Sequence, residues 1–299
     1  MRAEETLIIG AGPAGIAAAI QLYRSRVPFT LLEKERVGGL LWNANLVENY
    51  PGFPNGISGP RLAGLFEKQL RRTGVPVSFD RVSSVDFQKD GFLVLAEQAS
   101  YHPRYLIVAT GTKSRPLPIP FPEAVRDKIF TEVFPLLEAQ DQHIVIVGAG
   151  DAAFDYALNL AKRNRVSILH RNQQASCLPL LWEKAVINPR ITYQDRTSLA
   201  RVEAIPAKNR LRLVGLQRMA PFEIECDGLI YAIGREPQVD LLSPQLIAEK
   251  TRLERLGRLY LVGDVVNGSL RQTAIAVGDG LRAAMHICAD ITGMEAHNL

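Results

Sequence analysis

The sequence predicts an α/β protein built from two Rossmann-like, three-layer ββα domains that bind nucleotides. Glycine-rich turns follow apolar strands at Gly10 and Gly148, and each turn leads into an alanine-rich helical segment. Two further apolar strands end in glycine turns, at Gly111 and Gly234. A chain of 299 residues is long enough for two domains that each bury a core of their own.

The first glycine turn has the spacing of a dinucleotide-binding site. Leu7–Ile9 predicts a buried strand, and Gly10, Gly12 and Gly15 form the pattern G-x-G-x-x-G before a helix. Gly10 permits a tight turn, Gly12 lets the backbone approach a pyrophosphate, and Gly15 lets the helix pack close to the strand. The next strand ends in Glu33, eighteen residues after Gly15, where a carboxylate can bind a ribose diol. Either FAD or NAD could fill such a site.

The second glycine turn differs from the first in the charge that follows it. An apolar strand ends at Val147 and enters a G-x-G-x-x-A turn containing Gly148 and Gly150. The next strand ends in His170 and Arg171 instead of an acid. An acid would repel the 2′-phosphate of NADPH, whereas an arginine can pair with it. The chain therefore offers one site suited to FAD and one suited to NADPH, although this arginine could also be an ordinary surface residue.

The segments between the two turns predict loops and helices. Residues 37–54 are rich in glycine, proline and asparagine, which predicts a long loop that either contacts the reactive end of a cofactor or merely connects elements. Residues 58–73 predict an amphipathic helix with Leu62, Leu65, Phe66 and Leu70 facing inward. The proline-rich residues 114–120 predict a linker and a domain boundary.

The second half of the chain continues with strands. Residues 191–193, 211–216 and 222–225 alternate apolar and polar side chains, as a β-meander does. Residues 259–262 predict a strand that ends in Gly263 and Asp264, and residues 281–291 predict the final helix. Asp264 could cap a helix, but beside a glycine it is better placed to bond the polar chain of a flavin.

Composition limits the class of protein. Apolar residues make up 47% and charged residues 22%, which is ordinary for a soluble globular protein. The net charge of +4 is too mild to indicate nucleic acid; it would suit an acidic protein partner, although an ordinary solvated surface is the simpler explanation. No apolar run is long enough to span a membrane. Cys177, Cys226 and Cys288 lie far apart without metal spacing, so we expect free thiols in a cytoplasmic protein.

Taken in order, these motifs resemble the thioredoxin-reductase-like flavoproteins, the small class of pyridine nucleotide-disulfide oxidoreductases. The resemblance covers nearly the whole chain and includes Gly38-Gly39, residues 47–52 and Arg271-Gln272. It implies a discontinuous FAD domain, residues 1–113 and 241–299, with an NAD(P)H domain inserted at residues 114–240. It also implies a homodimer.

The turns and the resemblance together nominate the residues that bind the cofactors. On the flavin side these are Gly10, Gly12, Pro13, Ala14, Gly15, Glu33, Gly39, Leu40, Trp42, Asn49, Ala109, Thr110, Gly111, Gly263, Asp264, Arg271, Gln272 and Thr273. On the NAD(P)H side they are Gly148, Gly150, Asp151, Ala152, His170, Arg171, Ile233 and Gly234. We expect the indole of Trp42 near the isoalloxazine. No metal ligands are expected, and no catalytic acid or nucleophile is assigned, because the cofactors carry the chemistry.

The chain departs from the family pattern in its redox residues. Thioredoxin reductases have a C-x-x-C shortly before the second glycine turn, where this chain has residues 131–134, Thr-Glu-Val-Phe. The acid that follows their dithiol is replaced by Pro135, and the thiol of bacillithiol disulfide reductases is replaced by Ala14. The arginine cluster that binds NADPH is reduced, with Asn172 and Ser176 in place of arginines. The plan therefore resembles ferredoxin(flavodoxin)–NADP reductases of the thioredoxin-reductase type more closely.

These observations predict an FAD-dependent NAD(P)H oxidoreductase that passes electrons from NADPH, or NADH, through the flavin to an external acceptor. A small acidic carrier such as a ferredoxin or flavodoxin is the expected partner. Two alternatives stay open at this point. One is an atypical thioredoxin-reductase-like enzyme or NAD(P)H oxidase with another acceptor, and the other is an FAD-binding sensor or assembly protein whose nicotinamide site has decayed.

Overall fold

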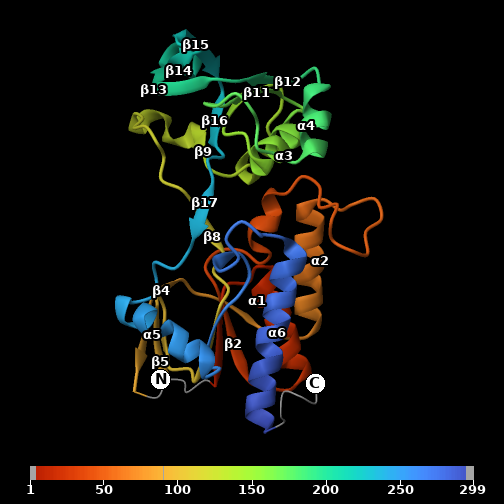
Figure 1. Cartoon of the computed structure of the whole chain (residues 1–299), viewed down its shortest axis with the longest axis vertical. Coiled ribbons are helices and arrows are strands. Elements are labelled where there is room, and N and C mark those ends of the chain that lie inside the picture. Colours follow the sequence, from red (N-terminus) through yellow and green to blue (C-terminus); the bar gives the residue numbers. More distant parts are fainter. Residues whose placement is uncertain (1–4, 90, 294–299) are drawn as a thin grey trace. The chain divides into compact units, whose positions relative to one another are not determined.

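The computed structural model describes residues 5–89 and 91–293. The chain divides into two compact units. The first comprises Met1–Trp42, Glu48–Lys113 and Glu236–Leu299, and the second comprises Asn43–Val47 and Ser114–Arg235. In Figure 1 the first unit accordingly carries both the red N-terminal and the blue C-terminal elements.

The units differ from the boundaries expected from sequence at two places. Asn43–Val47 groups with the second unit, because the Asn43 side chain both donates to Glu132 and accepts from the Phe134 backbone. Residues 236–240 group with the first unit. There the Gln238 N–H donates to the Gly111 carbonyl over 3.0 Å.

The first unit is built on a parallel sheet with the strand order β18-β7-β1-β2-β3. These strands are β1 (Thr6–Ile9), β2 (Phe29–Glu33), β3 (Val77–Phe79), β7 (Tyr105–Val108) and β18 (Leu259–Leu261). Its helices are α1 (Pro13–Arg24), α2 (Gly59–Arg72), α5 (Pro244–Arg255) and α6 (Thr273–Thr292). A small antiparallel sheet contains β4 (Val82–Gln88), β5 (Gly91–Ala96) and β6 (Ser100–Tyr101).

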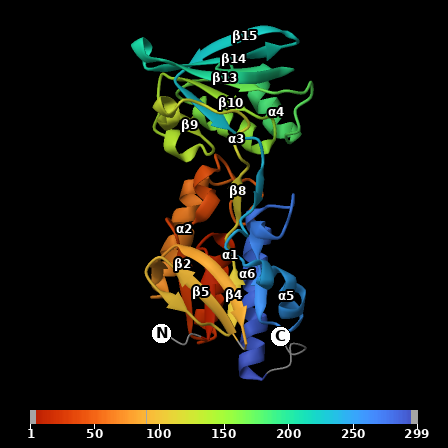
Figure 2. The same cartoon turned by 90° about the vertical axis from the view of Figure 1, so that its left-hand side faces the viewer.

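Alternating side chains of β1 build two cores in this unit. Ile8 belongs to the cluster that packs against α1 and α6, whereas Leu7 and Ile9 belong to the cluster that packs against β4, β5 and α5. This alternation follows from the two-residue period of a strand. Helices α1 and α6 form one layer, the parallel sheet forms the second, and the antiparallel sheet with α5 forms the third. Figure 1 shows α5 beside β4, and Figure 2 shows β4 beside β5.

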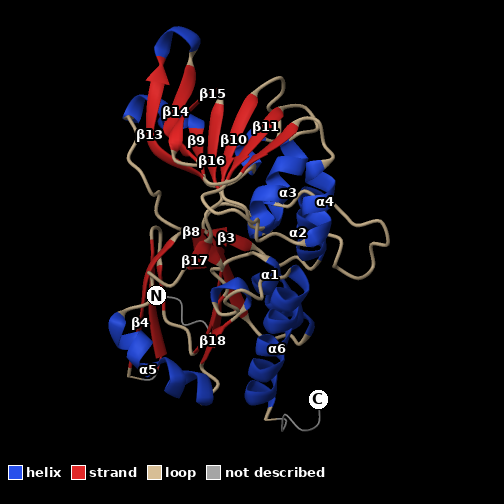
Figure 3. Cartoon of the chain, turned by 45° about the horizontal axis from the view of Figure 1, so that its top comes forward, coloured by secondary structure: helices blue, strands red, loops and turns tan. Residues whose placement is uncertain are grey.

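The second unit repeats this plan, with the parallel strand order β12-β11-β10-β16-β9. These strands are β9 (Ile129–Phe130), β10 (His143–Val147), β11 (Arg165–Leu169), β12 (Ile191–Gln194) and β16 (Gly228–Tyr231). An antiparallel meander consists of β13 (Thr197–Ile205), β14 (Arg210–Gln217) and β15 (Ala220–Cys226). Helices α3 (Asp151–Leu160) and α4 (Pro179–Val186) lie together beside the fan of parallel strands in Figure 3. Strands β8 (Thr112–Ser114) and β17 (Arg235–Pro237) pair where the chain passes between the units.

The expectation of two Rossmann-like α/β domains is confirmed, but three local expectations are wrong. Residues 191–193 pair in parallel with β11 and are not part of the meander, whose first strand is β13. The last helix begins at Thr273 and not at residue 281, so Gly280 lies inside the helix. Gly280 lets the helix approach α1 closely, because a Cβ there would lie 1.9 Å from the Ala14 carbonyl oxygen. Leu65 is 46% exposed, whereas Leu62 and Leu70 are buried as expected.

Within the described residues, no helix combines the length and the apolar character needed to cross a bilayer.

Candidate functional site

The first glycine turn is tight on its strand side and open on the other. Gly10 has a φ of +104°, and a Cβ there would lie 2.4 Å from the Ala109 carbonyl oxygen. A Cβ on Gly15 would lie 1.8 Å from the Gly10 carbonyl oxygen. A Cβ on Gly12, in contrast, would meet no protein atom within 4 Å. Two glycines therefore permit packing, and the third leaves a cradle that a phosphate can approach.

The start of α1 faces this cradle. Gly12 is the N-cap and makes no side-chain capping hydrogen bond, Pro13 occupies the first helical position, and the first turn has no acidic residue. Ala14 and Gly15 are buried in that first turn. The N–H groups and the positive end of the helix dipole are thus available to an anion beside Gly12.

Glu33 is fixed against the same turn. The residue is only 8% exposed, and its carboxylate accepts hydrogen bonds from the N–H of Ala11 (2.7 Å), Glu35 (3.0 Å) and Arg36 (3.3 Å). A carboxylate offers about four acceptor positions. These bonds hold the group in place and leave acceptor capacity for a ribose hydroxyl.

The loop after Glu33 returns to the turn. The Gly38 N–H donates to the Ala11 carbonyl over 2.8 Å, and a Cβ on Gly39 would lie 3.2 Å from the Gly12 Cα. Gly39 begins a 3-10 helix, η1 (Gly39–Asn43), which contains Leu40 and Trp42. The nominated residue Gly39 therefore lies at the cradle, and Leu40 follows it in η1.

Trp42 is anchored by its own loop. Its Nε1–H donates to the Val37 carbonyl over 2.8 Å, and the Arg36 guanidinium carbon lies 5.4 Å from the centre of its ring. These contacts show that the Trp42 side chain packs against residues of its own loop. Its proximity to the isoalloxazine stays a prediction.

The C-terminal part of the chain brings further nominated residues to the first unit's site. The Asn49 amide donates to the Gln272 side-chain oxygen over 2.8 Å, although the two residues are far apart in sequence. Gln272 is the N-cap of α6, which begins at Thr273, and Arg271 precedes it, half-buried. Gly263 packs against Ala14 of the turn, because a Cβ on Gly263 would lie 3.0 Å from the Ala14 Cβ.

Asp264 lies half-buried on the 3-10 helix η5 (Gly263–Val265).

The three residues that follow β7, Ala109, Thr110 and Gly111, form hydrogen bonds with other parts of the first unit. The Ala109 N–H donates to the Ile9 carbonyl over 2.8 Å, and the Gly111 carbonyl accepts from Gln238. The Thr110 hydroxyl donates to the Gln238 carbonyl over 2.7 Å.

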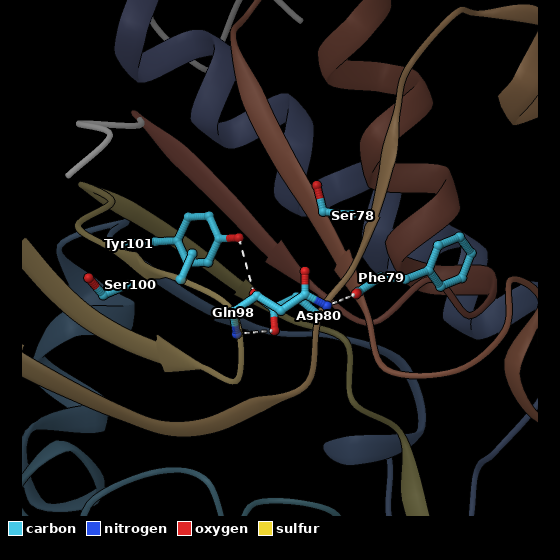
Figure 4. Close-up of a pocket in the computed structure, with 7 residues that line it drawn as sticks. Ser78, Phe79, Asp80, Gln98, Ser100 and Tyr101 are labelled. Carbon is cyan, nitrogen blue, oxygen red and sulfur yellow. Dashed lines mark hydrogen bonds between the residues drawn. The ribbon is translucent and has the colours of Figure 1, made fainter.

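A cavity near Glu33 went unnoticed in the sequence. It has a volume of about 590 Å³ and is lined by Ser78, Phe79, Asp80, Gln98, Ala99, Ser100 and Tyr101 (Figure 4). Asp80 is 5% exposed and accepts hydrogen bonds from the Gln98 N–H and the Tyr101 hydroxyl. Its own N–H donates to the Glu33 carbonyl over 3.0 Å. The position of Asp80 in the sequence could have pointed to this cavity, because Asp80 directly follows β3, just as Glu33 is the last residue of the neighbouring strand β2.

The second glycine turn repeats the backbone design of the first. Gly148 has a φ of +128°, and a Cβ there would lie 2.2 Å from the Ala232 carbonyl oxygen. Gly150 is the N-cap of α3, and the nearest atom to a Cβ on it would be the Ser176 hydroxyl oxygen, 3.9 Å away. Asp151 accepts from the Leu178 N–H over 2.7 Å, and Ala152 is exposed beside it.

The residues after β11 and β16 flank this second turn. Ring atom Nδ1 of His170 lies 3.0 Å from the Tyr193 hydroxyl, and burial, followed by the nearby Arg171 charge, lowers the pKa of His170. Arg171 is exposed, and no ion pair joins it to any residue that the structure describes. Ile233 is half-buried and Gly234 is exposed with a φ of +103°.

Arg115 is a further residue at this edge that the sequence analysis missed. Its N–H donates to the Gly234 carbonyl over 3.2 Å, and a Cβ on Gly234 would lie 3.5 Å from its Nε atom. The proline-rich residues 114–120 predict a linker from sequence, and Arg115 was therefore not considered as a site residue.

Glu132 belongs to a polar cluster at residues 131–134, the position where the family resemblance implies a dithiol. The Asn43 amide donates to a Glu132 carboxylate oxygen over 3.1 Å, and the other oxygen pairs with Arg235 over 3.2 Å. Nearby, the Asn45 N–H donates to Asp155 over 2.8 Å. Burial raises the pKa of Asp155 to about 6 although two backbone N–H donors oppose the shift.

The three cysteines are free thiols, as expected. Burial raises the pKa of Cys226 to about 12 and also raises that of Cys177. Cys288 is buried on α6. The described residues contain no group of three or more His, Cys, Asp or Glu side chains arranged to bind a metal ion.

The sequence matches the model of a known protein family over most of its length. The model, pyridine nucleotide-disulphide oxidoreductase, aligns with residues 4–280. The chain belongs to this family. The expected thioredoxin-reductase-like FAD/NAD(P) oxidoreductase, a flavin-dependent enzyme, is therefore confirmed at the level of family and fold.

Relatives in this family include thioredoxin reductases. The enzyme of Mycolicibacterium smegmatis is 29% identical over 94% of this chain and 94% of its own length. A protein described as the 34.2 kDa protein in a rubredoxin operon of Clostridium pasteurianum is 30% identical over 94% of this chain and 95% of its own. The structure of Lactococcus lactis thioredoxin reductase superposes with a TM-score of 0.84 and 24% identity, covering 97% of this chain and 99% of that one.

Proposed function

We propose that this oxidoreductase transfers electrons from NADPH, through FAD, directly to an external electron-carrier protein, a small acidic one such as a ferredoxin or flavodoxin. The observation that carries the proposal is the polar cluster of Asn43, Glu132 and Arg235 at the position of the family dithiol. No cysteine lies there, and the pKa values of Cys177 and Cys226 are raised by burial, so neither favours the reactive thiolate.

The first unit's residues fit FAD. The cradle at Gly12 and the uncapped start of α1 suit a pyrophosphate, and the Glu33 carboxylate suits a ribose diol. When bound, FAD supplies the acceptor for a hydride from the nicotinamide and the store from which electrons leave. In the second unit, Gly150 and the start of α3 would bind the phosphates of the nicotinamide nucleotide, and Arg171 would pair with its 2′-phosphate.

Two observations support a small acidic carrier as the acceptor. The chain carries a net charge of +4, which attracts an acidic partner. The relative described as a protein in a rubredoxin operon points to small electron carriers in this family. The family resemblance also leads us to propose a homodimer, which sedimentation equilibrium would test.

The acceptor assay uses the FAD-loaded protein with NADPH under anaerobic conditions. A ferredoxin, a flavodoxin, a rubredoxin and a thioredoxin are offered in turn. We expect reduction of at least one of the first three and none of the thioredoxin disulfide. Replacing all three cysteines by alanine should leave that reduction unchanged when rates are normalised to bound FAD. Thioredoxin reduction that disappears in the cysteine-free variant would contradict the proposal.

A further inference from the structure

A second cationic side chain lies at the edge of the second unit where Arg171 lies. The carboxyl ends of parallel strands meet at one edge of a sheet, and ligands bind there. The pairing of β11 and β12 continues past both strands. The His170 N–H donates to the Gln194 carbonyl over 2.9 Å, and the Thr197 N–H donates to the His170 carbonyl over 2.8 Å. Arg196 therefore lies beside the loop that follows β11.

The backbone of Arg196 is fixed in this position. Its N–H donates to the Asn172 carbonyl over 3.1 Å, and its carbonyl accepts from the Arg218 N–H over 2.9 Å. Its φ of +49° lies in the left-handed region, which is uncommon for a non-glycine residue, and these two hydrogen bonds stabilise that conformation. The base of its side chain thus has a defined place next to Asn172, one of the two residues that replace arginines of the family pattern.

The charge of Arg196 is only partly compensated. Its side chain is 50% exposed, and its Nε atom lies 3.7 Å from an Asp195 carboxylate oxygen. Arg218 bonds the same carboxylate at 2.8 and 3.3 Å, and this hydrogen bonding lowers the pKa of Asp195. Arg196 and Arg218 therefore share the single carboxylate of Asp195, and Arg171 lies next to Asn172 in the adjacent loop, so this group of four side chains carries a net positive charge.

We propose that Arg196 is a specificity-determining residue that pairs with the 2′-phosphate of NADPH together with Arg171. A phosphate monoester carries about −1.5 to −2 charges at neutral pH, so one arginine leaves it undercompensated. The planar guanidinium group suits phosphate oxygens better than the neutral Asn172 and Ser176 do. This inference rests on the proposed function, because it assigns the selectivity of the same nucleotide site.

The test measures equilibrium binding of NADP⁺ and NAD⁺ to the FAD-loaded full chain by titration calorimetry. The variants are Arg196→Ala, Arg196→Lys and Arg171→Ala. Arg163→Ala is the matched control, because Arg163 is also exposed and ion-paired (3.6 Å to Glu138), and its carbonyl accepts from Asp141 just before β10, at the opposite edge of the sheet.

We expect Arg196→Ala to weaken NADP⁺ binding about three- to tenfold, as for a solvent-exposed charged contact. NAD⁺ binding should stay unchanged, Arg196→Lys should recover part of the loss, and the control should match the wild type. An Arg196→Ala variant that binds NADP⁺ normally, or loses NAD⁺ binding equally, overturns the inference. If the wild type prefers NADP⁺ and only Arg171→Ala removes the preference, the inference fails while the proposed function stands. A wild type that binds neither nucleotide overturns both.

Discussion

The two glycine turns share one backbone design and differ in the charges around it. Gly10 and Gly148 both have positive φ values and pack against the carbonyl of the residue that follows a neighbouring strand. A Cβ on Gly12 would meet no protein atom within 4 Å, and one on Gly150 would meet only the Ser176 hydroxyl oxygen at 3.9 Å. Beside the first turn lies a buried carboxylate held by backbone N–H groups, and beside the second lies the exposed Arg171. We therefore propose that the turn binds phosphates in both units and that Glu33 and Arg171 determine which ribose each unit accepts.

The largest effect is expected from the glycines of the first turn. A methyl group at Gly12 meets no protein atom but enters the cradle, so Gly12→Ala should fold normally and bind FAD roughly ten- to a hundredfold more weakly, as for overpacking by about 1–3 kcal/mol. FAD affinity of the refolded apoprotein and thermal unfolding are the measurements.

Two other glycines calibrate this result. Gly15→Ala should impair folding itself, because its Cβ would overlap the Gly10 carbonyl. Gly64→Ala on α2, where a Cβ also meets open space, should bind FAD like the wild type. Normal FAD affinity in Gly12→Ala would mean that the cradle is not a phosphate site.

The buried carboxyl group of Asp155 in the second unit should make the stability of the protein depend on pH. Burial raises the pKa of Asp155 to about 6 from 3.8, so its contribution to stability is present below pH 4 and is lost as the pH rises through 6. Asp155→Asn does not ionise. The free energy of unfolding of the variant, relative to that of the wild type, should therefore increase by about 2–3 kcal/mol between pH 4 and pH 7. Denaturant unfolding at several pH values measures this, and a pH-independent difference would refute the assignment. Glu138→Gln, at an exposed acid, is the control.

Glu33→Ala tests the buried acid of the first unit. The substitution leaves three backbone N–H groups without their acceptor, which should cost about 1–3 kcal/mol of stability. FAD should also dissociate faster, because the proposed ribose contact is lost. Glu33→Gln keeps one acceptor oxygen, so its stability and its FAD dissociation rate should lie between those of the wild type and those of Glu33→Ala. Unchanged FAD dissociation in both variants would remove Glu33 from the flavin site.

Arg171→Ala should have the smallest of these effects. We expect it to reduce the affinity for NADPH about tenfold, the lower end for a charge-assisted contact, and to leave NADH binding almost unchanged. Fluorescence titration with each nucleotide gives the ratio. A native protein that uses both nucleotides equally would contradict the comparison of the two turns.

Local patterns predicted the fold and the framework of the site, and long-range contacts account for what was missed. The glycines of Gly10–Gly15 and Gly148–Gly150 each lie between a strand and the helix that follows it, so their spacing in the sequence was enough to predict the two strand–turn–helix units. No local signal joins Asn43 to Glu132, Arg196 to Asn172, or Asp80 to Glu33. The wrong start of the last helix has the same origin, because Gly278 and Gly280 resemble helix breakers until the packing of α6 on Ala14 is known.

We propose that FAD binds in the first unit, that the nicotinamide nucleotide binds in the second, and that hydride passes from the nicotinamide to the flavin. This proposal can be tested by an anaerobic titration of the purified protein with each nucleotide, followed by flavin absorbance. We expect one FAD per chain, and we expect NADPH to bleach the flavin at lower concentrations than NADH does. A protein that takes up no FAD, or whose bound flavin is reduced by neither nucleotide, would contradict it.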